Sequence, residues 1–297
     1  MASSAQLKRR LRLYSKSLVE FWGLYKSNRL ALLGLGILLF FVILALFPTY
    51  LSPYDPRKMG TVEEHMNPPS WQHLFGTDDV GKDILSLVIH GSRTSLVIGF
   101  LASFVAVGIG TVAGITSGYY GGLKGELLMR VTDVFLVLPL LPLMILMAAL
   151  LTPSIWNIIM AIGLTAWTST ARITRSMTLS LKQRTYVERA RSIGCSDPRI
   201  LRRHLLPTIL PLVFANSVIV AAIAIASEAI LSFLGLGDVN AISWGTILYF
   251  AFSRGSFTLG AYWYFLPPGI CIVLVIVAFT MMGNGLDEIL NPRLRRL

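Results

Sequence analysis

Six long runs of apolar residues alternate with polar stretches along the 297-residue chain. Each run is continuous, with no alternation of apolar and polar positions, which favours membrane helices over the strands of a barrel. A helix of roughly 20 apolar residues crosses the hydrocarbon core of a bilayer. The pattern therefore predicts an all-α integral membrane protein with six transmembrane helices. These six spans are predicted at residues 30–47, 95–118, 131–151, 155–171, 208–231 and 266–283.

The polar stretches form the predicted termini and loops. Residues 1–29 mix Lys and Arg with Leu and aromatic side chains, as in a helix lying at the cytoplasmic membrane surface. A basic tail explains this segment equally well. The fourth span, the weakest by length and polarity, is expected to continue into the next loop as one long helix. The other polar segments are an external loop at 48–94, a cytoplasmic loop at 172–207, an external loop at 232–265 and a cytoplasmic tail at 284–297.

The placement of charge predicts the orientation of the chain. Of its 26 Lys and Arg, 21 lie in the two terminal segments, the loop at 119–130 and the loop at 172–207, and 5 lie in the two external loops. Cytoplasmic loops of membrane proteins carry such an excess of positive residues. We therefore expect both termini and the central loop to be cytoplasmic. The net charge of +11 then reports orientation, and no nucleic-acid partner is expected.

Composition and spacing exclude several kinds of chemistry. With 54% hydrophobic and 14% charged residues, the chain is far more apolar than a soluble domain. Cys195 and Cys271 fall in a cytoplasmic loop and in a span, so they cannot form a structural disulfide. The four histidines lack metal-site spacing, and there is no G-x-x-x-x-G-K-S/T phosphate-binding loop. We expect this chain to have no catalytic residue and to bind no metal or cofactor.

The longest strongly polar run between two spans lies at 186–207. A helix is expected to stop near Gly194, a residue type that ends many helices. Asp197 and Pro198 favour a new start, with a carboxylate at the N-cap and proline at the first helical position. This short second helix is expected to end before Pro207, because the proline ring clashes with the preceding turn.

Spacing also predicts local ion pairs for two carboxylates. Glu188 lies one helical turn from Arg184 on one side and from Arg191 on the other. Asp133, near the start of the third span, lies one turn from Arg130. Opposite charges three or four residues apart on a helix stabilise it.

The same polar run carries a sequence resemblance. It is similar to the EAA loop, E-A-A-x3-G-x9-I-x-L-P, of permease subunits in ATP-binding-cassette importers. Arg189 and His204 depart from that pattern. The resemblance implies that the loop forms a coupling helix seated in a groove of an ATPase subunit. A polar hairpin that is basic through topology alone is the alternative. The candidate coupling residues are Glu188, Ala190, Gly194, Cys195, Ser196, Asp197, Pro198, Leu206 and Pro207.

Other stretches resemble the branch of this family that carries dipeptides, oligopeptides and nickel. Residues 75–96, FGTDDVGKDILSLVIHGSRTSL, are similar to its external segment FGTDxxGRDxxSRxxxGxRxSL, with Lys82 where the branch has arginine. Residues 238–242 replace the prolines of the branch, which puts the shape of that loop in doubt. The further matches are SFLGLG at 232–237, SWG at 243–245 and MGNGLDEILNPRLRR at 282–296.

The resemblance covers nearly the whole chain after about Leu30. It implies a type I importer permease in the cell membrane, with a core domain at 95–283. The partners it implies are a second permease subunit, two ATPase subunits that hold ATP and Mg, an extracytoplasmic binding protein and membrane lipid. Di- or oligopeptides are the expected solutes, and oligosaccharides or nickel remain open.

Small residues recur at every fourth position in the second span. Such a ridge lets a neighbouring helix backbone approach closely in lipid, where apolar burial alone gives no preference for protein. Its partner is expected to be a helix of this chain or of a second permease. The ridge residues are Ala102, Ala106, Gly110, Gly114 and Gly118.

Three residues within the spans are candidates for the translocation pathway. Pro139 and Pro142 are expected to bend the third span, and bent helices can line a pathway. Glu228 is the one acid in the later spans, and an acid in a membrane helix is a functional candidate. Counting about 1.5 Å per residue puts it at the external boundary. A capping role there competes with a role as solute ligand.

The function predicted is thus that of a permease subunit without its own ATPase site. The competing class is a secondary transporter or channel. Such proteins show acids, broken helices or repeated halves near the middle of the bilayer, and this sequence shows little of that.

Overall fold

The computed structural model describes residues 22–290, with side chains to 289. Most of the predicted segment 1–29 and the end of the tail therefore lie outside the described residues. Within residues 22–290 the regular secondary structure is helical, apart from one isolated bridge between Thr77 and Asp83. The elements are α2 (Arg29–Leu46), α3 (Pro48–Leu51), the 3-10 helix η1 (Val62–Glu64), α4 (Ile84–Tyr120), α5 (Gly122–Val137), α6 (Leu140–Leu150), α7 (Ile155–Gly163), α8 (Thr168–Lys182), α9 (Thr185–Ser192), α10 (Asp197–Ile200), the π turn η2 (Leu201–Leu205), α11 (Leu206–Phe233), α12 (Trp244–Ser253) and α13 (Tyr262–Leu290).

Four helical segments in the described part are long and apolar enough to cross a membrane. Helices α5 and α6 form a fifth candidate if they are counted as one span. The predicted all-α membrane fold is confirmed. The count of six spans and the cytoplasmic position of the termini stay predictions. The four segments are Arg29–Leu46, Ile84–Tyr120, Asp197–Phe233 and Tyr262–Ile289.

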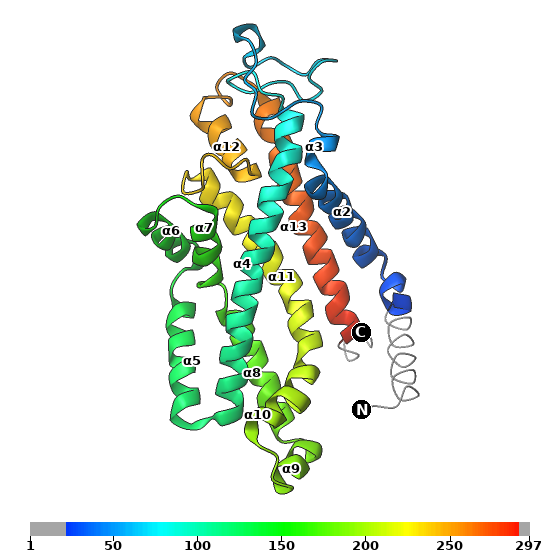
Figure 1. Cartoon of the computed structure of the whole chain (residues 1–297), viewed down its shortest axis with the longest axis vertical. Coiled ribbons are helices and arrows are strands. Elements are labelled where there is room, and N and C mark those ends of the chain that lie inside the picture. The colour runs from blue at the N-terminus through cyan, green and yellow to red at the C-terminus, as the bar shows by residue number, and fades with distance from the viewer. Residues whose placement is uncertain (1–21, 291–297) are drawn as a thin grey trace.

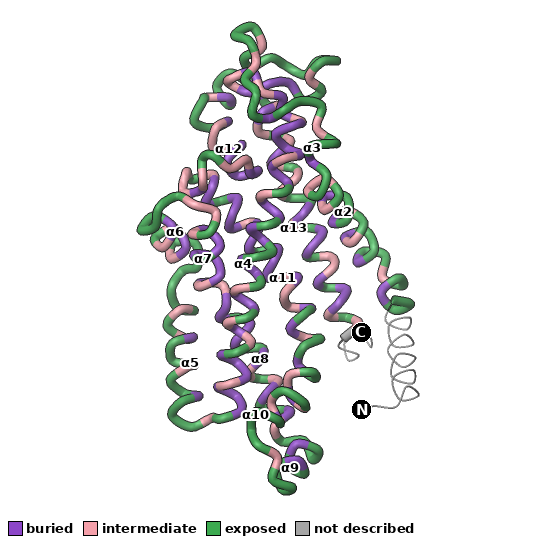
Figure 2. The backbone as a smooth tube through the Cα atoms, viewed as in Figure 1, coloured by how far each residue is buried: buried purple, intermediate pink, exposed green. Residues whose placement is uncertain are grey.

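The two long helices α4 and α11 run through the centre of the molecule (Figure 1). Helices α2 and α13 pack against one side of this pair, and α8 packs along the C-terminal half of α4. Helix α5 lies at the edge and is largely exposed, whereas α4 is buried along much of its length (Figure 2). Helix α4 is therefore the element on which the others assemble.

The small-residue ridge of α4 faces α8 of the same chain. A Cβ atom at Gly110 would lie 2.5 Å from the carbonyl oxygen of Trp167, and one at Gly114 would lie 2.5 Å from that of Ala171. Only hydrogen fits at such a distance, so the ridge allows the two backbones to touch. All five ridge residues, Ala102, Ala106, Gly110, Gly114 and Gly118, are buried.

The fourth predicted span, 155–171, is divided between two helices. Helix α7 ends at Gly163 and α8 begins at Thr168. Between them, the Thr165 N–H donates to the carbonyl of Ile162, only three residues back. This hydrogen bond spans three residues instead of four, so it interrupts the regular hydrogen-bond pattern of the α-helix. The prediction of one continuous helix from this span into the cytoplasmic loop is therefore wrong.

The third predicted span, 131–151, is broken at Pro139. Helix α5 ends at Val137, Leu138 is extended, and Pro139 is the N-cap of α6. The two helices are bent by 94°. Pro142 is the third residue of α6, where a missing N–H removes no intrahelical bond. The predicted bend is confirmed, and a pathway role for either proline stays a prediction.

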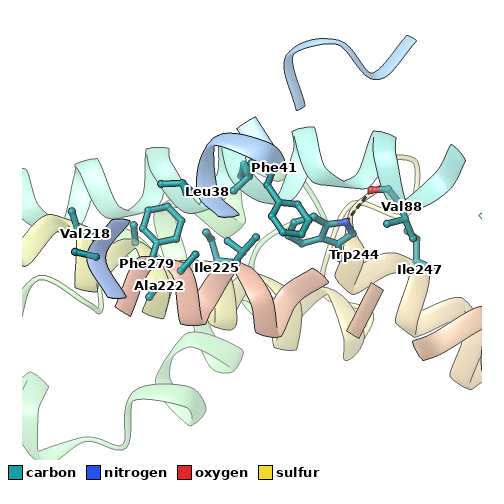
Figure 3. Close-up of a cluster of buried hydrophobic side chains, with 14 of the residues drawn as sticks. Leu38, Phe41, Val88, Val218, Ala222, Ile225, Trp244, Ile247 and Phe279 are labelled. Carbon is teal, nitrogen blue, oxygen red and sulfur yellow. Dashed lines mark hydrogen bonds between the residues drawn. The ribbon is translucent and has the colours of Figure 1, made fainter. Parts of the chain in front are cut away.

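Trp244, the first residue of α12, lies beside Phe41 and Val88 in a buried hydrophobic cluster (Figure 3). Its indole Nε1 donates to the carbonyl of Val88 in α4 at 3.0 Å, and its backbone N–H donates to Ser95 Oγ at 3.2 Å. Phe41 of α2 packs edge-on against the indole, with 5.4 Å between ring centroids. One buried side chain thus joins α2, α4 and α12.

The external segments hold more helix than predicted. Helix α4 begins at Ile84, inside the predicted loop 48–94. It begins there because Asp83 caps it, accepting from the Ser86 N–H at 2.8 Å. Helix α12 likewise lies inside the predicted loop 232–265.

Candidate functional site

The polar segment between α8 and α11 forms a helix, a glycine turn and a second helix. Helix α9 ends at Ser192, as predicted, and Gly194 follows with φ of 81°. Glycine adopts this left-handed conformation without steric cost. The N–H groups of Gly194 and Cys195 close the turn on the carbonyls of Arg191 and Ala190, each at 3.0 Å. The chain therefore turns at Gly194, which is the glycine of the EAA-like pattern.

The second helix does not end before Pro207, contrary to the prediction. The predicted start is also wrong by one residue, because Ser196 is the N-cap of α10, Asp197 is the first helical residue and Pro198 is the second. The helix then passes through the π turn η2, where the Leu206 N–H bonds to the carbonyl of Leu201, five residues back. Because a π turn is wider than an α turn, it accommodates the Pro207 ring without breaking the helix. A single helix of 37 residues runs from Asp197 to Phe233.

A few apolar side chains anchor this segment to the body of the protein. Val187 and Ala190 of α9 and Ile200 of α10 are buried in one hydrophobic cluster with Leu205. The polar side chains point outward, so the surface of the segment is free in this chain. Glu188, Gly194, Ser196, Asp197, Pro198 and Pro207 are exposed, and Cys195 and Leu206 are half-buried.

Neither predicted local ion pair is formed. Glu188 has no partner within ion-pair distance among the described residues, because Arg184 is the extended N-cap of α9 rather than part of its helix. Asp133 pairs with Arg172 of α8, with 2.7 Å between Oδ1 and NH2. Arg130 pairs instead with Glu126, one turn earlier on α5. The Asp133 pair joins α5 to α8, a contact that spacing within α5 could not indicate.

Tyr119, in the last turn of α4, contacts the segment directly. Its hydroxyl donates to Asp197 Oδ1 at 2.6 Å. The Lys182 ammonium and the Arg191 guanidinium lie over its ring, 5.7 Å and 5.6 Å from the centroid. The sequence analysis placed Tyr119 in the loop at 119–130 and did not single it out, whereas it lies in α4.

Glu228 lies inside the core of the chain, not on an open surface. It is fully buried, and it accepts hydrogen bonds from Ser95 Oγ of α4 at 3.0 Å and Ser232 Oγ of α11 at 2.9 Å. Ser95 also accepts from the backbone N–H of Trp244. The carboxyl group thus belongs to the network that holds α4, α11 and α12 together. In this structure Glu228 neither lies at a cavity mouth nor caps a helix end, and its contact with solute stays a prediction.

The external stretch 75–96 is built around two buried aspartates. Asp78 Oδ1 accepts from the backbone N–H groups of Val80 at 2.9 Å and Lys82 at 2.7 Å. Burial raises the pKa of Asp78 from 3.8 to about 6, and the two backbone donors oppose this rise. Asp83 caps α4 and also contacts the His73 imidazole at 3.0 Å. The family-like motif here shapes a loop.

The described residues contain no group of three or more His, Cys, Asp or Glu side chains that could hold a metal ion. Cys195 and Cys271 are both free thiols. The candidate site is therefore the exposed surface of α9 and α10 itself.

Two family models match the chain. The model of the binding-protein-dependent transport system inner membrane component matches residues 110–296. The model of the N-terminal TM domain of oligopeptide transport permease C matches residues 17–69. The chain belongs to the family of binding-protein-dependent inner-membrane permeases. It is accordingly a multi-pass protein of the inner membrane.

Curated relatives match this permease over nearly its full length. The dipeptide transport system permease protein DppC of Bacillus subtilis is 35% identical, over 93% of this chain and 86% of the relative. The glutathione transport system permease protein GsiD of Escherichia coli O157:H7 is 35% identical, over 93% of this chain and 90% of the relative. The oligopeptide transport system permease protein OppC of Bacillus subtilis is 34% identical, over 97% and 92%.

A solved structure shares the fold of the permease. An inward-facing form of the MetNI methionine ABC transporter matches 70% of this chain and 98% of that chain, with a TM-score of 0.57 and 17% identity. At that identity, the match concerns the arrangement of helices alone. It agrees with the ABC-permease fold that the EAA-like segment indicated.

Proposed function

We propose that this permease forms part of the pathway of an ATP-driven importer for di- or oligopeptides. The main support is the set of relatives, whose names state dipeptide, oligopeptide or glutathione transport. In this proposal an extracytoplasmic binding protein delivers the peptide and a second permease completes the pathway. ATP and Mg are held by two partner ATPase subunits, and this chain has no ATPase site of its own.

The exposed surface of α9 and α10 is the proposed contact with an ATPase subunit. Two of its arginines remain available to a partner, because among the described residues no ion pair involves Arg184 or Arg189. Since α10 continues through η2 into α11, a movement of α10 would carry α11 with it as one rigid body. ATP-driven closure of the ATPase pair would thus swing a membrane helix.

A pair of substitutions tests the coupling role. Gly194→Ala forces a side chain into a φ of 81°, whereas Gly194→Asn is the matched control, since asparagine tolerates this region. We expect Gly194→Ala to lower peptide uptake and stimulated ATPase activity together while membrane insertion persists. Glu188→Ala should do the same, because the side chain supports no ion pair within the described chain. Normal uptake in both variants would contradict the coupling role.

Cross-linking tests the contact itself. Cys195 lies at the turn between α9 and α10. A scan of single cysteines over the partner ATPase surface should find positions that form a disulfide with Cys195. If no position cross-links in an assembled and active complex, the contact surface is assigned wrongly.

Uptake by the reconstituted complex tests the solute. Proteoliposomes that contain both permeases and the ATPases, supplied with the binding protein, should take up labelled dialanine in an ATP-dependent manner. Maltotriose and Ni²⁺ serve as competing solutes. Transport of either in place of dialanine would overturn the peptide assignment. Uptake by this chain alone, driven by an ion gradient, would overturn the importer proposal.

A further inference from the structure

Tyr119 is a buried aromatic residue where α4 meets the coupling segment. It is 2% exposed, although the neighbouring Tyr120 is 48% exposed. Its hydroxyl donates at 2.6 Å to Asp197, the first residue of α10. A hydrogen bond to a carboxylate at this distance is of the charge-assisted kind, which is stronger than a neutral one. Tyr119 therefore ties the end of a central membrane helix to the start of α10.

Two cations add contacts to the same side chain. Lys182, the last residue of α8, donates from Nζ to the Tyr119 carbonyl at 2.6 Å and lies over the ring. Arg191 of α9 also lies over the ring, at 5.6 Å. Cations over an aromatic face are attracted by its quadrupole. Tyr119 thus contacts α8, α9 and α10 at once, and we refer to these four side chains (Tyr119, Lys182, Arg191, Asp197) as the Tyr119 cluster.

The covalent connections of the segment show why this cluster matters. Toward α11 the chain is one continuous helix. Toward α8 it is interrupted, because α8 ends at Lys182 and Arg184 is extended before α9 begins. A push on α10 is therefore transmitted rigidly to α11 but not, through the backbone, to α8 or α4. The Tyr119 cluster bridges that interruption.

We propose that Tyr119 is a positioning residue that makes α4 and α8 move with the coupling segment, so that both halves of the membrane bundle respond to the ATPase. This inference rests on the proposed importer function. The ridge of α4 packs tightly on α8, so a force applied to the end of α4 reaches both helices. Without the Tyr119 hydroxyl, α11 would still follow the ATPase, and α4 and α8 would lag behind.

The test is Tyr119→Phe in the complete complex in proteoliposomes, with labelled dialanine as the transported probe. Phenylalanine keeps the ring and its cation contacts and removes only the hydroxyl. We expect dialanine transported per ATP hydrolysed to fall roughly tenfold, the scale of one hydrogen bond to a charged group. Basal ATPase activity and complex assembly should be unchanged. Tyr120→Phe is the matched control and should behave as wild type.

A second set of variants separates positioning from simple structural support. Asp197→Asn retains an oxygen acceptor for Tyr119 and should keep most of the coupling, whereas Asp197→Ala should lose it. The double variant Tyr119→Phe with Asp197→Ala should transport as much dialanine per ATP as either single variant, because both changes remove the same hydrogen bond. Additive losses, or a fall in assembly that matches the fall in transport, would overturn the proposal. So would wild-type coupling in Tyr119→Phe.

Failure of the importer function would look different. In that case the wild-type complex itself would show no dialanine uptake linked to ATP hydrolysis. A wild-type complex that couples normally, together with a Tyr119→Phe complex that couples equally well, would reject the role of Tyr119 alone.

Discussion

The two ends of this permease use polar side chains in opposite ways. The end at α12 is predicted to be external and is called the external end; the end at α9 and α10 is predicted to be cytoplasmic and is called the cytoplasmic end. At the external end, Trp244, Glu228 and Asp83 are buried, and each is hydrogen-bonded to a different helix or to a helix start. At the cytoplasmic end, the polar residues of α9 and α10 are exposed, and a few apolar side chains hold the segment in place. The hydrogen bonds of the external end thus stabilise its shape, whereas the exposed polar groups of the cytoplasmic end are available to a partner protein.

The physical reason is the cost of burying polar groups. A buried donor or acceptor without a partner destabilises a protein by about 1–3 kcal/mol, so buried polar groups occur as satisfied networks. An exposed polar group forms hydrogen bonds to water, and these can be replaced by hydrogen bonds to a partner protein. The two ends should therefore respond to mutation very differently.

The largest effect is expected for Trp244→Ala at the external end. The change removes a fully buried indole and its bond to the Val88 carbonyl. Replacing a buried tryptophan by alanine costs about 3–5 kcal/mol. We expect a clear fall in the thermal unfolding temperature in detergent. Trp71, which is 98% exposed, is the matched control, and an equal fall in Trp71→Ala would remove the contrast between buried and exposed residues.

A smaller, pH-dependent effect is expected at Asp78. Its pKa is raised from 3.8 to about 6, so the folded state favours the protonated form. The stabilisation from this group is full below about pH 4 and is lost as the pH rises through 6, by at most roughly 3 kcal/mol. Asp78→Asn keeps an acceptor for the Val80 and Lys82 N–H groups and removes the charge. The thermal unfolding temperature should fall from pH 5 to pH 7 in the wild type, and this fall should be smaller in Asp78→Asn.

An unchanged difference between pH 5 and pH 7 in Asp78→Asn would assign the effect to another group. His73, which contacts Asp83 in the same loop, is then the next residue to replace.

Glu228→Ala tests whether the buried network is structural. The change leaves the hydroxyls of Ser95 and Ser232 without their acceptor, at a cost of about 2 kcal/mol. We expect lower thermal stability and an unchanged order of preference among peptides in uptake. The control is Glu126→Ala on α5, because the Glu126 side chain is 62% exposed. A changed peptide preference with normal stability would restore Glu228 as a solute ligand.

The smallest effect is expected for Asp133→Asn. Its ion pair with Arg172 joins α5 to α8, but both side chains are at least half exposed. Exposed ion pairs contribute about 0–1 kcal/mol, less at high salt. The unfolding temperature should change little. A large fall would show that this pair is shielded from water in the assembled membrane complex, and the contrast between the two ends would weaken.

The motifs were more predictable than the contacts they make. The EAA-like spacing located the exposed segment, and the matched Gly194 does end α9. The SWG stretch was visible as a family mark, but nothing local indicated that Trp244 would bond to α4. Pro207 was expected to stop the helix. The prediction was wrong because the π turn before Pro207 accommodates its ring, and the formation of a π turn depends on the whole helix around it. Asp133 was misjudged because its partner lies on another helix, 39 residues away.

The amino-acid sequence by itself determined the chemical class of the protein. Long apolar runs require helices in a bilayer, because every backbone polar group must bond within its own segment there. The asymmetry of Lys and Arg and the spacing around Glu188 and Gly194 are equally local properties. Only the tertiary structure decided that the α4 ridge packs on α8, that Glu228 is enclosed and that Tyr119 reaches Asp197. These depend on distances between helices, which residues far apart in the chain set together and no single stretch encodes.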